Sequence, residues 1–131
     1  MSPDVAVKTP VLVIEDEPSV LSFVKAALER AGYSVATVAT GAEALIMLKH
    51  DRYLGVVSDM RTPGGVDGAD VHAWISSNKP ELVSRVIFIT GDIVNEEPAA
   101  TLRRTGAPCV EKPFRVQQLI DIVKKVMGTP Q

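Results

Sequence analysis

Residues 11–18 read Val-Leu-Val-Ile-Glu-Asp-Glu-Pro, an unbroken apolar run that passes directly into acidic residues and a proline. Continuous apolar strands are typical of a parallel sheet that is covered by helices on both faces. Pro18 suits the first turn of a helix, where its missing amide is not needed. This stretch therefore predicts a buried strand, an acidic turn and a helix in immediate succession.

The same alternation continues along the chain. Short apolar runs predict strands at residues 11–14, 34–38, 54–58, 85–89 and 107–111. Helical spacing or capping signals predict helices at residues 18–31, at 40–48, at 69–77, from 95–98 to 105, and at 116–127. Five such units predict one domain over residues 1–131, with a core at about 10–127. The predicted fold is an α/β three-layer sandwich, a flavodoxin-like (βα)5 fold whose parallel sheet has strand order 2-1-3-4-5.

Composition restricts the class of protein. The chain has 131 residues with 14 basic and 16 acidic side chains, so no basic excess is available to neutralise a nucleic-acid backbone. The single cysteine, Cys109, excludes an intramolecular disulfide and is typical of a reducing compartment. We find no secretory signal and no apolar run of membrane-spanning length. A cytoplasmic protein without direct nucleic-acid or membrane binding is expected.

Polar side chains follow four of the five predicted strands at their carboxyl ends, where ligands bind in such sheets. They are Glu15, Asp16, Asp59, Thr90 and Lys112. The three carboxylates would raise one another's pKa unless a cation lay between them, and their oxygens select a hard ion such as Mg²⁺. A metal ion, a hydroxyl and an ammonium together suit a phosphoryl group, with one carboxylate as its acceptor.

Each of these residues also has a simpler interpretation. Asp16 could cap a helix, Asp59 and Thr90 could belong to turns, and Lys112 could begin a solvated helix. Their complementary chemistry at one end of the sheet favours the functional interpretation.

The sequence resembles a response-regulator receiver domain, the phosphoacceptor module of two-component signalling. The matching features extend over nearly the whole chain; they are Val13–Pro18, Asp59 with Pro63-Gly64 and Asp67-Gly68, Phe88–Gly91, and Glu111–Phe114. The resemblance implies that Asp59 accepts a phosphoryl group from a sensor histidine kinase or a histidine phosphotransfer protein. It also implies that Mg²⁺, or Mn²⁺ in its place, is held by Asp16, Glu15 through water, Asp59 and the main-chain carbonyl of Arg61.

The resemblance further implies that Thr90 and Lys112 contact the phosphoryl oxygens. The fourth helix, fifth strand and fifth helix would then form the surface that controls a downstream protein. Beyond self-phosphotransfer and autodephosphorylation, no enzymatic activity is implied. The chain would act as a monomer or weak homodimer, either alone or as the receiver segment of a larger protein such as a hybrid histidine kinase.

The sequence departs from the family's pattern at two places. Cys109 stands where receivers usually carry Tyr or Phe, so the usual ring rotation is not available as a switch. The loop after Asp59 has one extra residue between Pro63-Gly64 and Asp67-Gly68, which we expect glycine flexibility to absorb. We also hypothesise that Arg61 pairs with Asp92 across the pocket and changes the lifetime of the acyl phosphate.

Two other functions remain open at this point. A haloacid-dehalogenase-like phosphatase also uses an aspartyl nucleophile with magnesium, but it needs a second aspartate where this chain has Arg61. The third candidate is an interaction module that works without phosphorylation because Cys109 has disabled the switch. His50 and His72 are interpreted as surface residues, and the Arg103-Arg104 and Lys124-Lys125 pairs as solvated helix faces.

Overall fold

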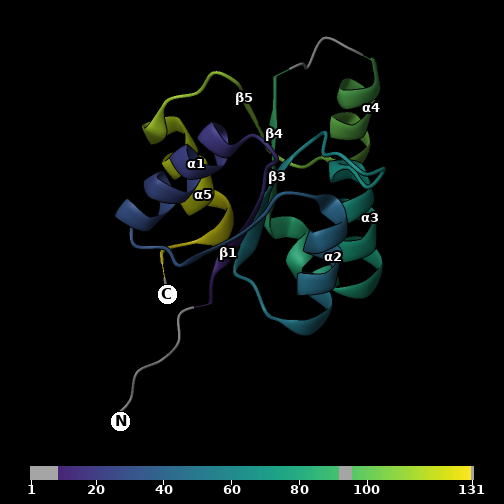
Figure 1. Ribbon diagram of the computed structural model, residues 1–131, viewed down its shortest axis with the longest axis horizontal. Coiled ribbons are helices and arrows are strands. Elements are labelled where there is room, and N and C mark those ends of the chain that lie inside the picture. Colours follow the sequence, from purple (N-terminus) through teal and green to yellow (C-terminus); the bar gives the residue numbers. More distant parts are fainter. Residues whose placement is uncertain (1–8, 92–95, 131) are drawn as a thin grey trace.

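The structure is a computed structural model that describes residues 9–91 and 96–130. Within these ranges the chain forms a five-stranded parallel sheet of order β2-β1-β3-β4-β5, as predicted (Figure 1). The strands are β1 (Val11–Ile14), β2 (Val35–Val38), β3 (Gly55–Asp59), β4 (Val86–Thr90) and β5 (Cys109–Glu111). The helices are α1 (Pro18–Arg30), α2 (Gly41–His50), α3 (Gly68–Asn78), the short 3₁₀ helix η1 (Pro80–Arg85), α4 (Glu96–Thr105) and α5 (Val116–Met127).

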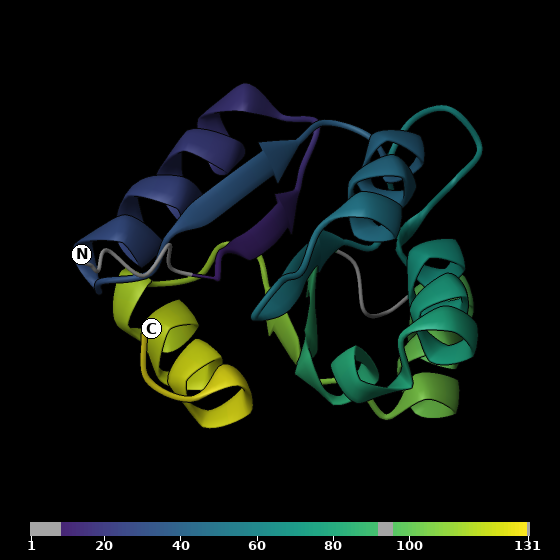
Figure 2. The same ribbon diagram turned by 90° about the horizontal axis from the view of Figure 1, so that it is seen from below.

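The helices cover both faces of the sheet and so complete three layers. Helices α1 and α5 lie together on one face, whereas α2, α3 and α4 lie on the other (Figure 2). The predicted α/β sandwich is therefore confirmed. No helix within residues 9–91 and 96–130 has the length and apolar character that a membrane crossing requires.

Alternate side chains of each strand enter different halves of the core. Val11 and Val13 of β1 pack into the apolar cluster beneath α1 and α5, whereas Leu12 and Ile14 pack into the cluster beneath α2 and α3. All four are at most 1% exposed. Burial on both faces explains why this strand is a continuous apolar run instead of an alternating one.

Local capping sets where the helices begin. Pro18 occupies the first turn of α1, and the Thr40 hydroxyl accepts a hydrogen bond from the Glu43 amide (3.1 Å) at the start of α2. At α3 the carboxylates of Asp67 and Asp70 each accept the other's amide, both at 3.1 Å. This reciprocal cap begins α3 one residue earlier than predicted, because it satisfies amides that the first turn leaves unpaired.

Other bounds also differ from the prediction, most of them by one or two residues: β2, β3 and β4 each begin one residue later than predicted, and α2 spans Gly41–His50 instead of residues 40–48. Strand β5 spans three residues instead of five, because its register with β4 runs from Cys109 to Glu111. The 3₁₀ helix η1, which joins the end of α3 to β4, was not predicted. Pro80 suits the first turn of this short helix, where its missing amide is not needed.

The long loop between β3 and α3 is accommodated as predicted. Gly64 and Gly65 have φ values of 88° and 81°, which glycine adopts without strain. The Thr62 hydroxyl donates a hydrogen bond to the Val66 carbonyl and closes the loop. The Val66 carbonyl in turn lies so close to Gly41 that a side chain there would collide with it. The extra residue is therefore held against the start of α2.

Candidate functional site

The strand order brings the predicted site residues to one rim of the sheet. Strand β1 lies beside β3 with Ile14 opposite Ser58, so that Glu15 and Asp59 follow at neighbouring positions. Strand β3 is also paired with β4, whose last residue is Thr90. The Lys112 amide donates to the Thr90 carbonyl at 2.8 Å, which continues the β4–β5 pairing up to Lys112. Asp59 and Thr90 thus end their strands instead of following them.

The three carboxylates form one cluster. One oxygen of each of Glu15, Asp16 and Asp59 lies within 4.8 Å of the other two. Their environments differ, since Glu15 is buried, Asp59 is half-buried and Asp16 is exposed. The predicted convergence of these residues is confirmed.

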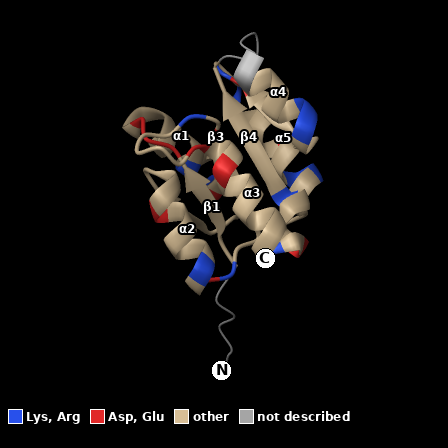
Figure 3. Ribbon diagram, turned by 90° about the vertical axis from the view of Figure 1, so that its right-hand side faces the viewer, with Lys and Arg blue, Asp and Glu red and all other residues tan. Residues whose placement is uncertain are grey.

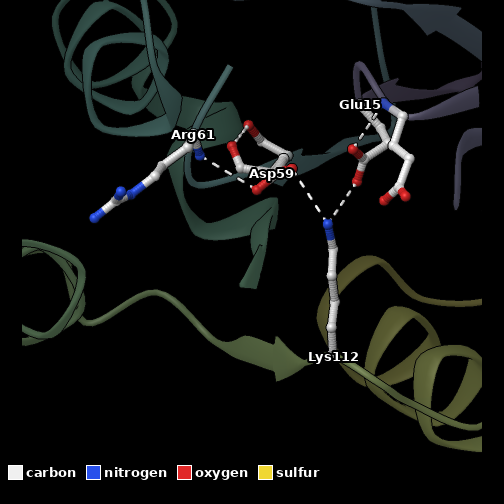
Figure 4. A network of polar contacts seen from close by, with 6 residues as sticks. Glu15, Asp59, Arg61 and Lys112 are labelled. Carbon is white, nitrogen blue, oxygen red and sulfur yellow. Dashed lines mark hydrogen bonds and ion pairs between the residues drawn. The ribbon is translucent and has the colours of Figure 1, made fainter. Parts of the chain in front are cut away.

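Lys112 bridges two of these carboxylates. Its Nζ lies 3.2 Å from Glu15 Oε1 and 3.3 Å from Asp59 Oδ2, so the ammonium stands between the two side chains (Figure 4). Burial acts to lower the pKa of Lys112, but the charges of Asp59 and Glu15 outweigh it and raise the pKa. The side chain therefore carries a fixed positive charge beside Asp59 at neutral pH. The Lys112–Pro113 peptide that follows is cis.

Glu15 is the most confined acid of the cluster. Its Oε2 accepts the Glu17 amide at 3.1 Å, whereas its buried Oε1 accepts no well-aligned hydrogen bond from the part of the chain that the structure describes. Burial raises the pKa of Glu15, and the charge of Asp59 raises it further, against the lowering effects of the Glu17 amide and Lys112. An additional cation nearby would stabilise the charged form of Glu15.

These residues fit a hard divalent cation. The donors are all carboxylate oxygens from two adjacent strand ends, and one of them is buried without a well-aligned hydrogen bond. Mg²⁺ binds through a few carboxylates and keeps several waters, which suits a cluster that is open on its Asp16 side. Thiol and imidazole ligands, which would favour zinc, do not take part in this cluster of described residues.

Arg61 approaches the cluster through its main chain. Its amide donates to Asp59 Oδ1 at 3.2 Å, while its exposed guanidinium extends away from Asp59 and Lys112 (Figure 4). The role of its carbonyl as a metal ligand stays a prediction. Asp92, its hypothesised partner, lies outside the described residues.

The predictions for the histidines and the basic pairs are confirmed in part. His50 and the Arg103-Arg104 and Lys124-Lys125 pairs are exposed, as predicted. His72 is not a surface residue: it is half-buried, and its ring lies 5.9 Å from that of Phe88. The helical pattern missed this contact because His72 follows the apolar Val71 at the edge of the buried face of α3. Cys109 is partly buried against the core.

An apolar hollow beside Lys112 was not predicted. It has a volume of about 600 Å³ and is lined by α1 residues, including Val20 and Phe23, and by Phe114 after β5. The rings of Phe23 and Phe114 lie 5.7 Å apart, and Phe23 is 41% exposed. A signal was available, because Phe23 stands three residues after Val20 on the same side of α1.

Comparison with known proteins now identifies the family. The family model of the response regulator receiver domain matches residues 11–124. The chain belongs to this family. Receiver domains are signalling modules of two-component systems and generally not enzymes, so the phosphatase alternative loses its support.

Individual relatives agree with this assignment. The chain is 31% identical over 110 residues to the probable transcriptional regulatory protein TcrX of Mycobacterium tuberculosis, covering 84% of this chain and 46% of TcrX. It is 29% identical to the response regulator receiver protein CpdR of Brucella abortus, covering 89% and 95% of the two chains. The chain thus spans less than half of TcrX but nearly all of CpdR.

Solved structures show the same fold. The receiver domain of NtrX from Brucella abortus has a TM-score of 0.80 at 28% identity, covering 89% of this chain and 97% of that one. The receiver domain of the sensor histidine kinase PA1611 from Pseudomonas aeruginosa has a TM-score of 0.81 at 24% identity, covering 94% and 100%. That structure contains a magnesium ion in its active-site cleft.

Proposed function

We propose that Asp59 is the phosphoacceptor of this receiver domain. The observation that carries the proposal is the position of the Asp59 carboxylate. It is only 13% exposed and lies between an acidic cluster on one side and the Lys112 ammonium on the other. One of its oxygens would attack phosphorus as the bond from phosphorus to the donor's imidazole nitrogen breaks, leaving an aspartyl phosphate.

In this proposal Glu15, Asp16 and Asp59 hold Mg²⁺, with the Arg61 carbonyl as a further ligand and Mn²⁺ as a possible substitute. The bound ion would neutralise charge on the phosphoryl oxygens as they approach the carboxylates. Asp16 is exposed and so can ligate the ion directly. The buried Glu15 is suited to act through a water molecule, because its Oε2 is already occupied by the Glu17 amide.

Lys112 and Thr90 would bind the other phosphoryl oxygens. The Lys112 ammonium already contacts Asp59, and it would move with the new charge from the carboxylate to the phosphoryl group. Thr90 is 3% exposed and ends β4, where its hydroxyl can approach the same group. Arg61 stands where a phosphatase would need a second aspartate, and its guanidinium is directed away from Asp59 (Figure 4). Slow autodephosphorylation is therefore expected in place of turnover.

The proposed phosphoryl donor is a sensor histidine kinase or a histidine phosphotransfer protein. Such a partner must bring an imidazole to Asp59, and the apolar hollow formed by Phe23 and Phe114 lies directly beside Lys112. Apolar contacts around a charged centre are typical of transient recognition surfaces. The reducing cytoplasm, where a lone thiol persists, is the proposed location.

We further propose that phosphorylation changes the surface of α4, β5 and α5 and so controls a downstream protein, with the chain as a monomer or weak homodimer. Cys109 lies on this surface and is too small for a ring rotation, so the change would be carried by Thr90 and the adjoining main chain. If partner affinity is the same with and without a phosphoryl mimic, the interaction-module alternative is favoured instead.

The proposal is tested by intact mass after incubation with acetyl phosphate. The parent should gain one phosphoryl group only when Mg²⁺ is present, and the gain should be lost on treatment with hydroxylamine. Asp59→Asn should gain nothing, whereas Asp51→Asn, an exposed aspartate on the loop before β3, should behave as the parent. An equal gain in Asp59→Asn would overturn the assignment.

A further inference from the structure

A second cavity lies at the opposite end of the sheet from Asp59. Its volume is about 480 Å³, and it is bordered by the loop that leads into β3 and by η1, which leads into β4. The Leu54 amide, just before β3, donates to the Pro10 carbonyl just before β1. The cavity therefore lies at the amino ends of the strands, whereas the acidic cluster lies at their carboxyl ends.

The rim of this cavity is cationic. Arg52, Lys79 and Arg85 line it, and Glu81 is the carboxylate among the lining residues. Neither Arg52 nor Arg85 forms an ion pair with any residue in the described part of the chain. Figure 3 shows basic segments at the lower end of α2 and in the loop beside it, next to acidic ones; further basic segments lie on the side of α4 and α5. Three basic side chains and one acidic side chain in the lining contrast with the net charge of −2 of the whole chain.

The floor of the cavity is apolar and fixed. Tyr53, Leu54 and Leu82 line it and are 8%, 3% and 5% exposed. The Lys79 ammonium donates to the Asp51 carbonyl at 2.8 Å, and the Leu82 amide donates to the Lys79 carbonyl at 2.8 Å. These bonds join the end of α3 to the loop before β3 and to η1. The cavity is thus preformed by the fold.

We propose that this cavity binds a small phosphorylated compound. Guanidinium groups match phosphate oxygens with paired hydrogen bonds, and two unpaired arginines with a nearby ammonium provide these donors. The volume lies in the range of small-molecule sites. The phosphate would lie between Arg52 and Arg85, and the apolar part would rest on Leu54 and Leu82. This site is independent of phosphoryl transfer at Asp59.

Nitrogen-15-labelled protein in buffer without Mg²⁺ provides the test, with phenyl phosphate and inorganic phosphate as probes. Phenyl phosphate should produce saturable amide shifts at Leu54, Leu82 and Arg85 and leave the amides around Asp59 unchanged. It should bind several-fold more tightly than inorganic phosphate, because its ring covers the apolar floor. The Arg52→Gln, Arg85→Gln double variant should raise both dissociation constants at least tenfold.

Arg30→Gln is the matched control, because Arg30 is an exposed arginine at the end of α1 and does not line the cavity. It should leave both dissociation constants unchanged. Shifts that fail to saturate, shifts centred on Lys124 and Lys125, or equal losses in the control and the double variant would each overturn the site. Equal affinity for the two probes would overturn the proposed ligand class.

Discussion

Within the part of the chain that the structure describes, the Lys112 ammonium compensates two carboxylates at the carboxyl rim of the sheet. It contacts the buried Glu15 at 3.2 Å and Asp59 at 3.3 Å. Because Glu15 is 1% exposed, water cannot replace this contact fully. The residue therefore contributes to folding as well as to the proposed chemistry.

Replacing this lysine should destabilise the protein when no divalent ion is bound. We expect Lys112→Met to lower the free energy of unfolding by about 2 kcal/mol, since a buried carboxylate loses its charged partner. Mg²⁺ should restore part of this loss, because it binds the same acids in the folded state. Urea unfolding with and without Mg²⁺ measures both effects. Lys124→Met, an exposed change on α5, is the control, and equal stability of the two variants would contradict the assignment.

Cys109 should be an unreactive thiol. Burial, and after it the charge of Glu111, raises the pKa of Cys109 from 9.0 to about 11. At pH 8 its thiolate fraction is then about 100-fold below that of an unperturbed thiol, and the thiolate is the reactive form. Because a thiolate of higher pKa is also more nucleophilic, reaction with a disulfide reagent should be at least about tenfold slower in the folded protein than in urea. Equal rates would indicate an accessible, redox-sensing thiol.

For single residues, the sequence predicted which side chains share the candidate site better than it predicted which side chains are buried or in ring contact. The acid–lysine set followed from the residue types at the strand ends, because strand ends fix where side chains meet. The half-buried position of His72 depends on the ring of Phe88 in another element, which local spacing does not reveal. For the Phe23–Phe114 pair, the spacing of Val20 and Phe23 indicated an apolar side of α1 but not the ring of Phe114 that packs against it.

At the scale of elements, α1 and α5 are joined at their ends as well as along their apolar faces. The Tyr33 hydroxyl, just after α1, donates to the Gly128 carbonyl, just after α5, at 2.6 Å. Both helices contribute to the same apolar cluster. This bond fixes the chain after α5 against the loop that leads into β2.

Removing the hydrogen bond between Tyr33 and Gly128 should lower the stability of the folded protein. We expect Tyr33→Phe to lower the free energy of unfolding by about 1 kcal/mol at pH 7. Burial raises the pKa of Tyr33. The extra free energy of unfolding of the parent over Tyr33→Phe is therefore present below the unfolded-state pKa near 10 and is lost as the pH rises through the higher folded-state pKa. Urea unfolding at pH 7 and above pH 10 tests this; a difference that grows with pH would contradict it.

The packing of α3 near α4 should depend on pH through His72. Burial, and after it the charge of Arg104, lowers the pKa of His72. The resulting stability is present above the unfolded-state pKa of about 6.5 and is lost as the pH falls through the lower folded-state value. In His72→Gln the loss of stability between pH 7.5 and 5.5 should be smaller than in the parent, by up to about 1 kcal/mol. An identical pH dependence would show that His72 is not responsible.

Elements with strong local signals were predicted, whereas boundaries that depend on contacts with another segment were not. Strand β1 followed from its apolar run, and α1 from Pro18 and helical spacing. The limits of β5 depend on where β4 offers partners, and the start of α3 depends on a carboxylate pair that closes only in the folded turn. Such boundaries require the neighbouring chain to be in place.

At the scale of the whole molecule, the sheet separates two sites of opposite charge. The acidic cluster occupies the carboxyl ends of the strands, and the cationic cavity occupies their amino ends. The order of the strands could be predicted, because right-handed crossovers restrict how five such units pack. The cavity could not, because Arg52 lies in the loop before β3 and Arg85 ends η1, and only the fold brings these two segments together.

The central claim is that Asp59, among the 16 acidic residues of the chain, receives the phosphoryl group. Its most direct test is borohydride reduction of the protein after phosphorylation with acetyl phosphate and Mg²⁺, followed by peptide sequencing in a mass spectrometer. Reduction converts an aspartyl phosphate to homoserine and so records its position. We predict homoserine at position 59 and at no other aspartate. Homoserine at Asp16 or elsewhere, with Asp59 intact, would contradict the proposed phosphoacceptor.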